Sequence, residues 1–158
     1  MNRYLTERII PFEGIESFKL GMKIEEVRSI LKANKIPFNQ TEQSNKGTTS
    51  NVPWVFITVD SSLTFCFAKE VMYEMYFENQ YSGRLPNGVC IGMDSEELMN
   101  IDSSLMYNDE EEDFESQEGY WVVDDVLAKK VVCITIFLPI VETESFYNYE
   151  WVNEYLKE

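Results

Sequence analysis

The sequence contains no histidine and only three cysteines among its 158 residues. Without an imidazole, a serine or cysteine nucleophile has no histidine partner, and neither histidine proton transfer nor an imidazole metal site is possible. Cys66, Cys90 and Cys133 are odd in number, have no CxxC spacing and stand among apolar neighbours. We therefore expect reduced thiols in the core, and a protein that is not an enzyme and has no cofactor.

Long apolar segments are also missing. No run of about 18 apolar residues is present to span a bilayer, and the first eight residues lack the apolar core of a signal peptide. The composition, 44% hydrophobic and 14% aromatic, is that of a packed globular protein. We expect a cytoplasmic protein that folds as one domain or as two small halves with a common core.

Basic residues are scarce in the second half of the chain. Residues 1–84 contain ten Lys/Arg and ten Asp/Glu, whereas residues 85–158 contain three and eighteen. The net charge of −15 therefore arises entirely in the second half, where no basic residue occurs between Arg84 and Lys129. Such a surface repels nucleic acid and anionic membranes, so we expect neither as a ligand. A basic protein is the expected partner.

Two copies of one short motif are the most informative feature that is present. Residues 18–27 (FKLGMKIEEV) and 89–98 (VCIGMDSEEL) both carry a Gly-Met pair, two further positions and a Glu-Glu pair before an aliphatic residue. Glycine accepts the backbone angles of a sharp helix entry, and acidic residues stabilise a helix N-terminus. Residues 68–77 also align without gaps on residues 128–137. Two matched blocks in the same order predict a duplicated unit, with halves 1–84 and 85–158.

Apolar periodicity and polar breaks predict the elements of each half. The first half is expected to contain a helix at about 24–34, a loop at 40–51 with a ragged strand at its start, and strands at 52–59, 63–67 and 71–78. The second half is expected to contain a short helix at 96–101, strands at 105–108, 119–123 and 131–138, and a closing helix at 144–156 with Tyr147, Trp151 and Tyr155 on one face. Short breaks between strands indicate antiparallel hairpins.

The predicted fold class is α+β. Two tandem helix-plus-antiparallel-meander repeats would form one curved antiparallel sheet, with helices on one face and a C-terminal helix. Side-chain alternation predicts which residues of strand 71–78 face the helix: Val71, Tyr73, Met75 and Phe77. The gapless alignment gives this role in the second half to Val131, Cys133, Thr135 and Phe137. It leaves an open row, either a partner surface or, by preference, the seat of the closing helix: Val132, Ile134 and Ile136.

The Gly-Met turn, the Glu-Glu helix and the following meander resemble the BamE-like unit, and two such units in tandem resemble the architecture of beta-lactamase inhibitor protein. The residues that carry the resemblance are Leu20-Gly21-Met22 with Glu25-Glu26-Val27, Ile91-Gly92-Met93 with Glu96-Glu97-Leu98, and the strands that end at Phe77 and Phe137. The resemblance implies a concave sheet face that binds another protein. Small acidic cytoplasmic proteins of this appearance also occur as immunity proteins, which neutralise a polymorphic or contact-dependent toxin.

The candidate partner-binding site centres on residues 109–118, which hold seven carboxylates in ten residues. Self-repulsion would keep an isolated run of this kind extended and solvated. Alternatively, the run is a docking loop whose charges steer a Lys/Arg-rich partner while nearby aromatic residues supply affinity. The candidate residues are Asp109, Glu110, Glu111, Glu112, Asp113, Phe114, Glu115, Tyr120 and Trp121.

Two other uses of these carboxylates have less support. The run lacks the alternating Asp/Asn positions and central glycine of an EF-hand calcium loop. Nothing in the sequence brings two specific carboxylates to a cleft for glycosidase chemistry.

The favoured hypothesis is an immunity protein, monomeric when free, that forms a heterodimer with a basic toxin domain such as a nuclease. The alternative is an assembly module that oligomerises through its open sheet face.

Overall fold

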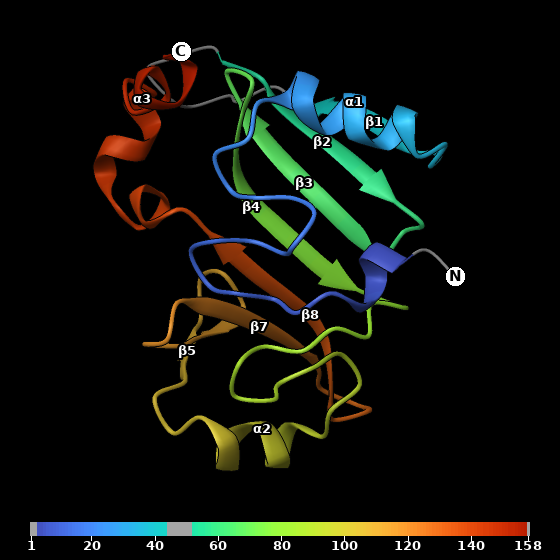
Figure 1. Cartoon of the computed structure of the whole chain (residues 1–158). Coiled ribbons are helices and arrows are strands. Elements are labelled where there is room, and N and C mark those ends of the chain that lie inside the picture. The colour runs from blue at the N-terminus through green and yellow to red at the C-terminus, as the bar shows by residue number, and fades with distance from the viewer. Residues whose placement is uncertain (1–2, 44–51, 158) are drawn as a thin grey trace.

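The computed structural model describes residues 3–43 and 52–157. Within these residues eight strands form one antiparallel sheet. Their bounds are Asn39–Gln43 (β1), Trp54–Val59 (β2), Leu63–Ala68 (β3), Val71–Glu78 (β4), Met106–Asn108 (β5), Asp113–Glu115 (β6), Tyr120–Asp125 (β7) and Lys130–Phe137 (β8). The spatial order is β1-β2-β3-β4-β8-β7-β6-β5, so β4 and β8 join the two halves into one sheet (Figure 1). The predicted α+β class with a single antiparallel sheet is confirmed.

Most of the predicted strands occur within two residues of their expected bounds. The ragged strand expected at the start of the loop at 40–51 is β1, and residues 44–51 lie outside the described residues. The structure adds a strand that the sequence did not predict, β6, inside the acidic run. Cys66 is buried, Cys90 and Cys133 are half-buried, and all three are free thiols.

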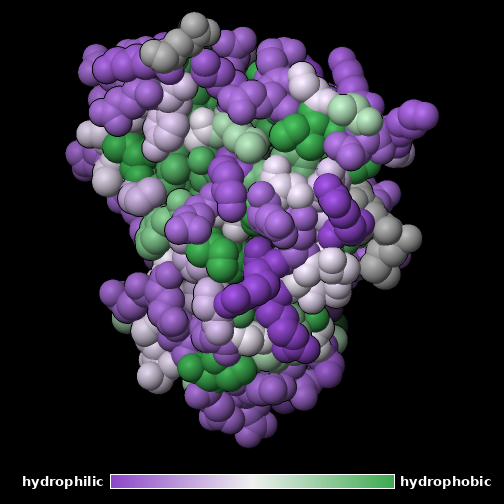
Figure 2. Space-filling model, viewed as in Figure 1, coloured by the Kyte–Doolittle hydropathy of each residue, from purple (hydrophilic) through white to green (hydrophobic). Residues whose placement is uncertain are grey.

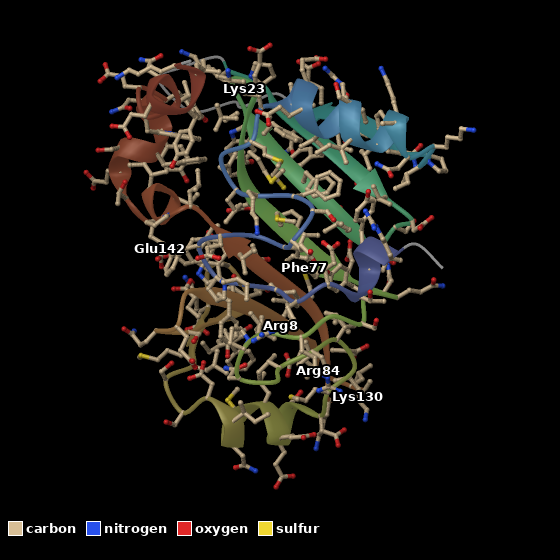
Figure 3. The ribbon with its side chains drawn as sticks, in the orientation of Figure 1. Arg8, Lys23, Phe77, Arg84, Lys130 and Glu142 are labelled. Carbon is tan, nitrogen blue, oxygen red and sulfur yellow. The ribbon has the colours of Figure 1, made fainter. Side chains whose placement is uncertain are left out.

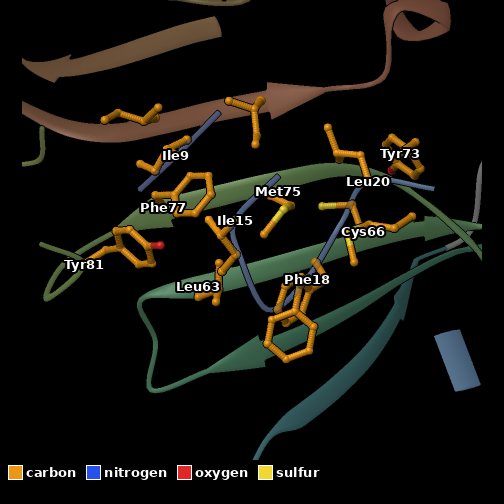
Figure 4. Close-up of a cluster of buried hydrophobic side chains, with 14 of the residues drawn as sticks. Ile9, Ile15, Phe18, Leu20, Leu63, Cys66, Tyr73, Met75, Phe77 and Tyr81 are labelled. Atoms are coloured by element: carbon orange, nitrogen blue, oxygen red, sulfur yellow. The ribbon is translucent and has the colours of Figure 1, made fainter. Parts of the chain in front are cut away.

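One face of the sheet is covered by helices and by the N-terminal segment (Figure 1). A 3₁₀ turn, η1 (Arg3–Thr6), leads into a chain segment that crosses β3, β4 and β8. Ile9, Ile15 and Phe18 of this segment pack into the core beside Met75 and Phe77 (Figure 4). This N-terminal segment is therefore a core element.

The two predicted helices flank this segment. α1 (Ile24–Ala33) lies beside β1 and β2, and α2 (Ser95–Ile101) lies at the other end of the molecule (Figure 1). α1 buries Ile24, Val27 and Leu31, and it carries glutamates in its first turn, where the helix dipole stabilises them. No helix within the described ranges has the length and apolar character of a membrane span. The surface on this side is largely hydrophilic with scattered apolar patches (Figure 2).

Each Gly-Met turn makes the same pair of backbone hydrogen bonds. The Gly21 amide donates to the carbonyl of Met72, and the Met72 amide donates back to the carbonyl of residue 22. The Gly92 amide likewise donates to Val131, and the Val131 amide donates back to residue 93. Both glycines have positive φ, 90° and 89°. The turns therefore fix the two helices to the beginnings of β4 and β8 in the same way.

These hydrogen bonds show that the gapless strand alignment was wrong by one residue. They match Met72, not Val71, to Val131. The pairing of β3 with β4 and that of β7 with β8 each contain an irregularity, so one extra residue, Tyr73 in β4 and Val132 in β8, has no cross-strand partner. Such a bulge reverses the faces on which the following side chains lie.

The predicted open row is consequently wrong. Ile134 lies opposite Phe77 and Ile136 lies opposite Met75, and both isoleucines are fully buried in the core. Only Val132 of the row is exposed. On the opposite face of the sheet lie residues that were expected to face the helix, Tyr73, Cys133, Thr135 and Phe137.

The predicted closing helix at 144–156 is also wrong, because this range breaks into two short pieces, η3 (Glu144–Asn148) and α3 (Val152–Leu156). A further 3₁₀ turn, η2 (Pro139–Glu142), precedes them. Tyr149 has a φ of 57°, which no α-helix accommodates. Its hydroxyl accepts a hydrogen bond of 3.0 Å from the indole of Trp54, and Phe146 packs on Tyr73. The segment therefore docks against β2 and β4, not over the isoleucines of β8, and Tyr147 does not share a helix face with Trp151 and Tyr155.

The two Gly-Met turns provide a matched test of this packing. A Cβ at Gly21 would lie 2.6 Å from the ring of Tyr155, whereas one at Gly92 would meet nothing within 4 Å. We expect Gly92→Ala to lower the free energy of unfolding by about 1 kcal/mol through its positive φ, and Gly21→Ala by about 2 kcal/mol. Urea denaturation measures both. In a Tyr155→Ala background the two substitutions should cost the same; a difference that persists there would contradict the assignment to Tyr155.

Candidate functional site

The sheet face opposite the N-terminal segment is hollowed into an open groove of about 530 Å³. A row of side chains that lie directly opposite one another crosses this face from β4 to β5. The row consists of Tyr76, Thr135, Trp121, Glu115 and Met106. Side chains alternate between the two faces of a strand, so the neighbours of these residues point into the core.

The walls of the groove come from segments that are distant in the sequence. The segment after β8 contributes Val141, Phe146 and Tyr147, and the β5–β6 hairpin contributes Glu111 and Asp113. Strands β2 and β4 complete the lining with Trp54, Phe56, Tyr73 and Glu74. The groove is thus rich in both aromatic rings and carboxylates.

Glu74 is a buried carboxylate in a strand that is otherwise mostly apolar, with 7% of its surface exposed. Burial raises the pKa of Glu74 to about 7; a hydrogen bond with Tyr76 opposes this rise, and the charges of Glu111 and Asp113 add to it. The three carboxyl groups line the same groove, Glu74 from β4 and the other two from the β5–β6 hairpin.

Asp113 is buried to a similar degree, with 8% exposed, and its Oδ1 has no hydrogen-bond partner among the described residues. Burial raises the pKa of Asp113 to about 6, and repulsion from Glu115 and Glu111 adds to the rise. The pKa of Glu142 is raised as well, by partial burial and by Glu115. A buried carboxylate oxygen without a donor costs free energy that the fold does not recover.

Asp102 shows how the same chain satisfies a buried carboxylate. It is 4% exposed and accepts hydrogen bonds from the amide and hydroxyl of Ser104, the hydroxyl of Ser116 and the hydroxyl of Tyr120. Burial alone would raise the pKa of Asp102, but these hydrogen bonds outweigh it and hold the pKa at about 2. Among the described residues, by contrast, Asp113 Oδ1 has no donor and Glu74 hydrogen bonds with Tyr76.

No basic side chain within the described ranges compensates the charge of the groove. The two ion pairs among the described residues lie outside the groove and join Arg28 to Glu25 and Lys130 to Asp94. Glu142 lies well apart from the labelled basic residues of this view, among them Lys23 and Arg84 (Figure 3). No group of three or more carboxylates or thiols in these ranges has an arrangement suited to a metal ion.

The structure divides the candidate residues from the sequence into three sets. Glu111, Asp113, Glu115 and Trp121 line the groove. Phe114 and Tyr120 point to the other face, where Phe114 packs on Tyr107 and Tyr120 donates to Asp102. The remaining residues are exposed in the turn between β5 and β6 and do not line the groove: Asp109, Glu110 and Glu112.

Sequence reasoning missed much of the groove. Glu74 and Tyr76 line the groove from β4, and the available signal was Glu74 itself, a carboxylate between apolar residues of the strand. Trp54 and Phe56 are two positions apart in β2, so they lie on one face of the strand. Because a strand buried on both faces has apolar residues on each, the sequence does not show which face lines the groove. No local signal assigned the residues after β8, Glu142, Phe146 and Tyr147, because their position depends on how the closing segment breaks.

Comparison with protein-family models, curated proteins and solved structures finds no match for this chain. The resemblance to the BamE-like unit therefore rests on the motif residues alone and stays a prediction.

Substitution of Asp102 and of Asp113 should change stability in opposite directions, because only Asp102 has a full set of hydrogen-bond donors. At pH 8 we expect Asp102→Asn to lower the free energy of unfolding by about 3 kcal/mol, because the amide cannot accept the same hydrogen bonds. Asp113→Asn should raise it by about 1 kcal/mol, because a buried charge without donors is removed. Urea denaturation gives both values. A loss of stability in both variants would mean that Asp113 is as well satisfied as Asp102.

The raised pKa of Glu74 predicts a pH dependence of stability. Between about pH 4.5, the ordinary glutamate value, and about pH 7, the folded chain keeps a proton that the unfolded chain releases. The free energy of unfolding should therefore fall as the pH rises through this window. Glu74→Gln should remove part of this fall and stabilise the protein at pH 8 by roughly 2 to 3 kcal/mol. Thermal denaturation from pH 4.5 to 8 tests this, and a variant with an unchanged pH profile would refute it.

Proposed function

We propose that this chain binds and neutralises a basic protein, as an immunity protein does for its toxin, without catalysing a reaction. The supporting observation is that Glu74 and Asp113 are buried in an open groove where, among the described residues, neither carboxylate forms an ion pair and Asp113 Oδ1 has no hydrogen-bond partner. Burial of unpaired carboxylates costs stability, and a positively charged partner would offset that cost on binding. Groups that lower the stability of a fold are typical of functional sites.

The same proposal includes the tandem architecture. We propose that residues 1–84 and 85–158 are two copies of a BamE-like unit, and the matched hydrogen bonds of the two Gly-Met turns support this. In that arrangement the groove lies where the copies meet: Glu74 and Tyr76 belong to the first copy, and Asp113 and Trp121 to the second. The concave face would then be the protein-binding face, as the resemblance implies.

The proposed partner is a cytoplasmic toxin domain with a basic cleft, of which a nuclease is the leading candidate. Carboxylates dispersed over a groove imitate the spacing of backbone phosphates and accelerate encounter with a cationic cleft. Aromatic side chains beside them, such as Trp121 and Tyr147, supply contact area at low entropic cost. The chain would be a monomer when free and one partner of a heterodimer when bound.

The alternative function, an assembly module, has lost one of its two possible surfaces. The row with Ile134 and Ile136 is buried in the core, which leaves the open edge of the sheet. The apolar side chains that remain exposed on the edge strand β5 are Met106 and Tyr107, at 70% and 52%. Sedimentation of the free chain distinguishes the two functions, because a stable homo-oligomer favours the assembly module.

Two charge-reversal pairs in one hairpin test the proposed surface. Glu111→Lys with Glu115→Lys changes the groove, whereas Asp109→Lys with Glu112→Lys makes the same change of charge in the turn outside it. With the toxin encoded by the neighbouring upstream gene as partner, we expect the groove pair to weaken binding at least about 100-fold and abolish growth rescue. The turn pair should mainly slow association, by less than about tenfold.

Three outcomes of that experiment count against the proposal. If both pairs weaken binding equally, total charge and not the groove decides the affinity. If neither pair changes binding, the groove is not the contact surface. If the wild-type chain neither binds nor rescues growth from that toxin, the proposed neutralisation is wrong.

A further inference from the structure

The groove combines the two features that distinguish recognition of a guanidinium group from recognition of other cations. One is a desolvated carboxylate that lacks donors, and the other is a set of flat aromatic walls. A guanidinium ion carries five N–H donors in a planar fork, is weakly hydrated and stacks on aromatic faces.

Asp113 provides the unsatisfied acceptor. It is buried and lines the groove, and its Oδ1 has no hydrogen-bond partner among the described residues. Glu115, two residues further along β6, is already engaged, because its Oε2 accepts a 2.7 Å hydrogen bond from Asn108. Of these two carboxylates, Asp113 is the one with an oxygen that has no donor among the described residues.

The aromatic walls line the same groove as this acceptor. Tyr76 and Trp121 belong to the row that crosses the groove, one on each side of Thr135. The indole of Trp121 is held in place by stacking on Phe137, with ring centroids 4.3 Å apart. A planar cation placed against such a ring gains cation–π attraction that grows as water is excluded.

We propose that the groove receives one guanidinium group, which hydrogen bonds to Asp113, lies near Glu74 and stacks against the rings of Tyr76 and Trp121. That the group is an arginine side chain of a bound protein rests on the proposed function, whereas the pocket itself rests on the groove. A primary ammonium is compact and strongly hydrated and does not stack. A trimethylammonium group has no N–H to donate to Asp113.

The test uses the full ¹⁵N-labelled chain and four uncharged-backbone probes: the N-acetyl amides of arginine, citrulline, lysine and trimethyllysine. Titration followed by NMR should show saturable binding of the arginine probe, with shifts centred on Asp113, Thr135 and the indole of Trp121. The lysine probe should bind about tenfold more weakly. The citrulline probe, which has nearly the same shape without the charge, should not bind.

A matched pair of variants locates the contact. Asp113→Asn and Glu112→Gln each remove one negative charge from the same hairpin, but only Asp113 lines the groove. Asp113→Asn should weaken the arginine probe at least about tenfold, and Glu112→Gln less than twofold. The NMR spectrum of each free variant shows that it is folded.

Several results would overturn the pocket: equal binding of the citrulline or lysine probe, tighter binding of trimethyllysine, shifts confined to the exposed turn 109–112, an Asp113→Asn variant that binds normally, or no saturable binding up to about 50 mM arginine probe. If the arginine probe binds as expected but no basic toxin is neutralised, the pocket stands and the proposed function fails. If a toxin is neutralised and Asp113→Asn binds it with wild-type affinity, the pocket fails and the proposed function stands.

Discussion

The pairing of β4 with β8 is the constraint on which the rest of the structure depends. It joins strands from the two halves of the chain into one sheet and sets which side chains share a face. Met75 lies opposite Ile136 on the core side, and Tyr76 lies opposite Thr135 on the groove side. A slip of one residue would move the apolar set into the groove and the polar set into the core. Core and groove are therefore two consequences of one register.

The sheet carries buried carboxylates of two kinds, and the difference between them is informative. Asp102 is surrounded by donors from Ser104, Ser116 and Tyr120, so its charge contributes to the stability of the fold. Glu74 and Asp113 are buried to a similar degree, but among the described residues Asp113 Oδ1 has no hydrogen-bond partner and Glu74 hydrogen bonds with Tyr76. Because a chain that can build one satisfied site leaves this oxygen of Asp113 without a donor, stability alone does not explain the groove, whereas a cationic ligand would.

Much of the local structure was predictable because it depends on residues close together in the sequence. The apolar spacing of Ile24, Val27 and Leu31 identified α1, and the short polar breaks identified the hairpins of β2, β3 and β4. The acidic run pointed to part of the groove, through Glu111, Asp113 and Glu115. The same run also suggested exposed residues of its turn that do not line the groove, because charge density carries no information about strand faces.

The sequence by itself determined the element types, the two Gly-Met turns and the confinement of the negative charge to residues 85–158. Only the tertiary structure decided the faces. The bulges at Tyr73 and Val132 arise from strand pairing and not from local preference, and each reverses the alternation that follows it. The left-handed backbone of Tyr149, which breaks the closing helix, is accompanied by a long-range hydrogen bond to Trp54. Glu74 and Asp113 line one groove only because strands distant in the sequence share one face of the sheet.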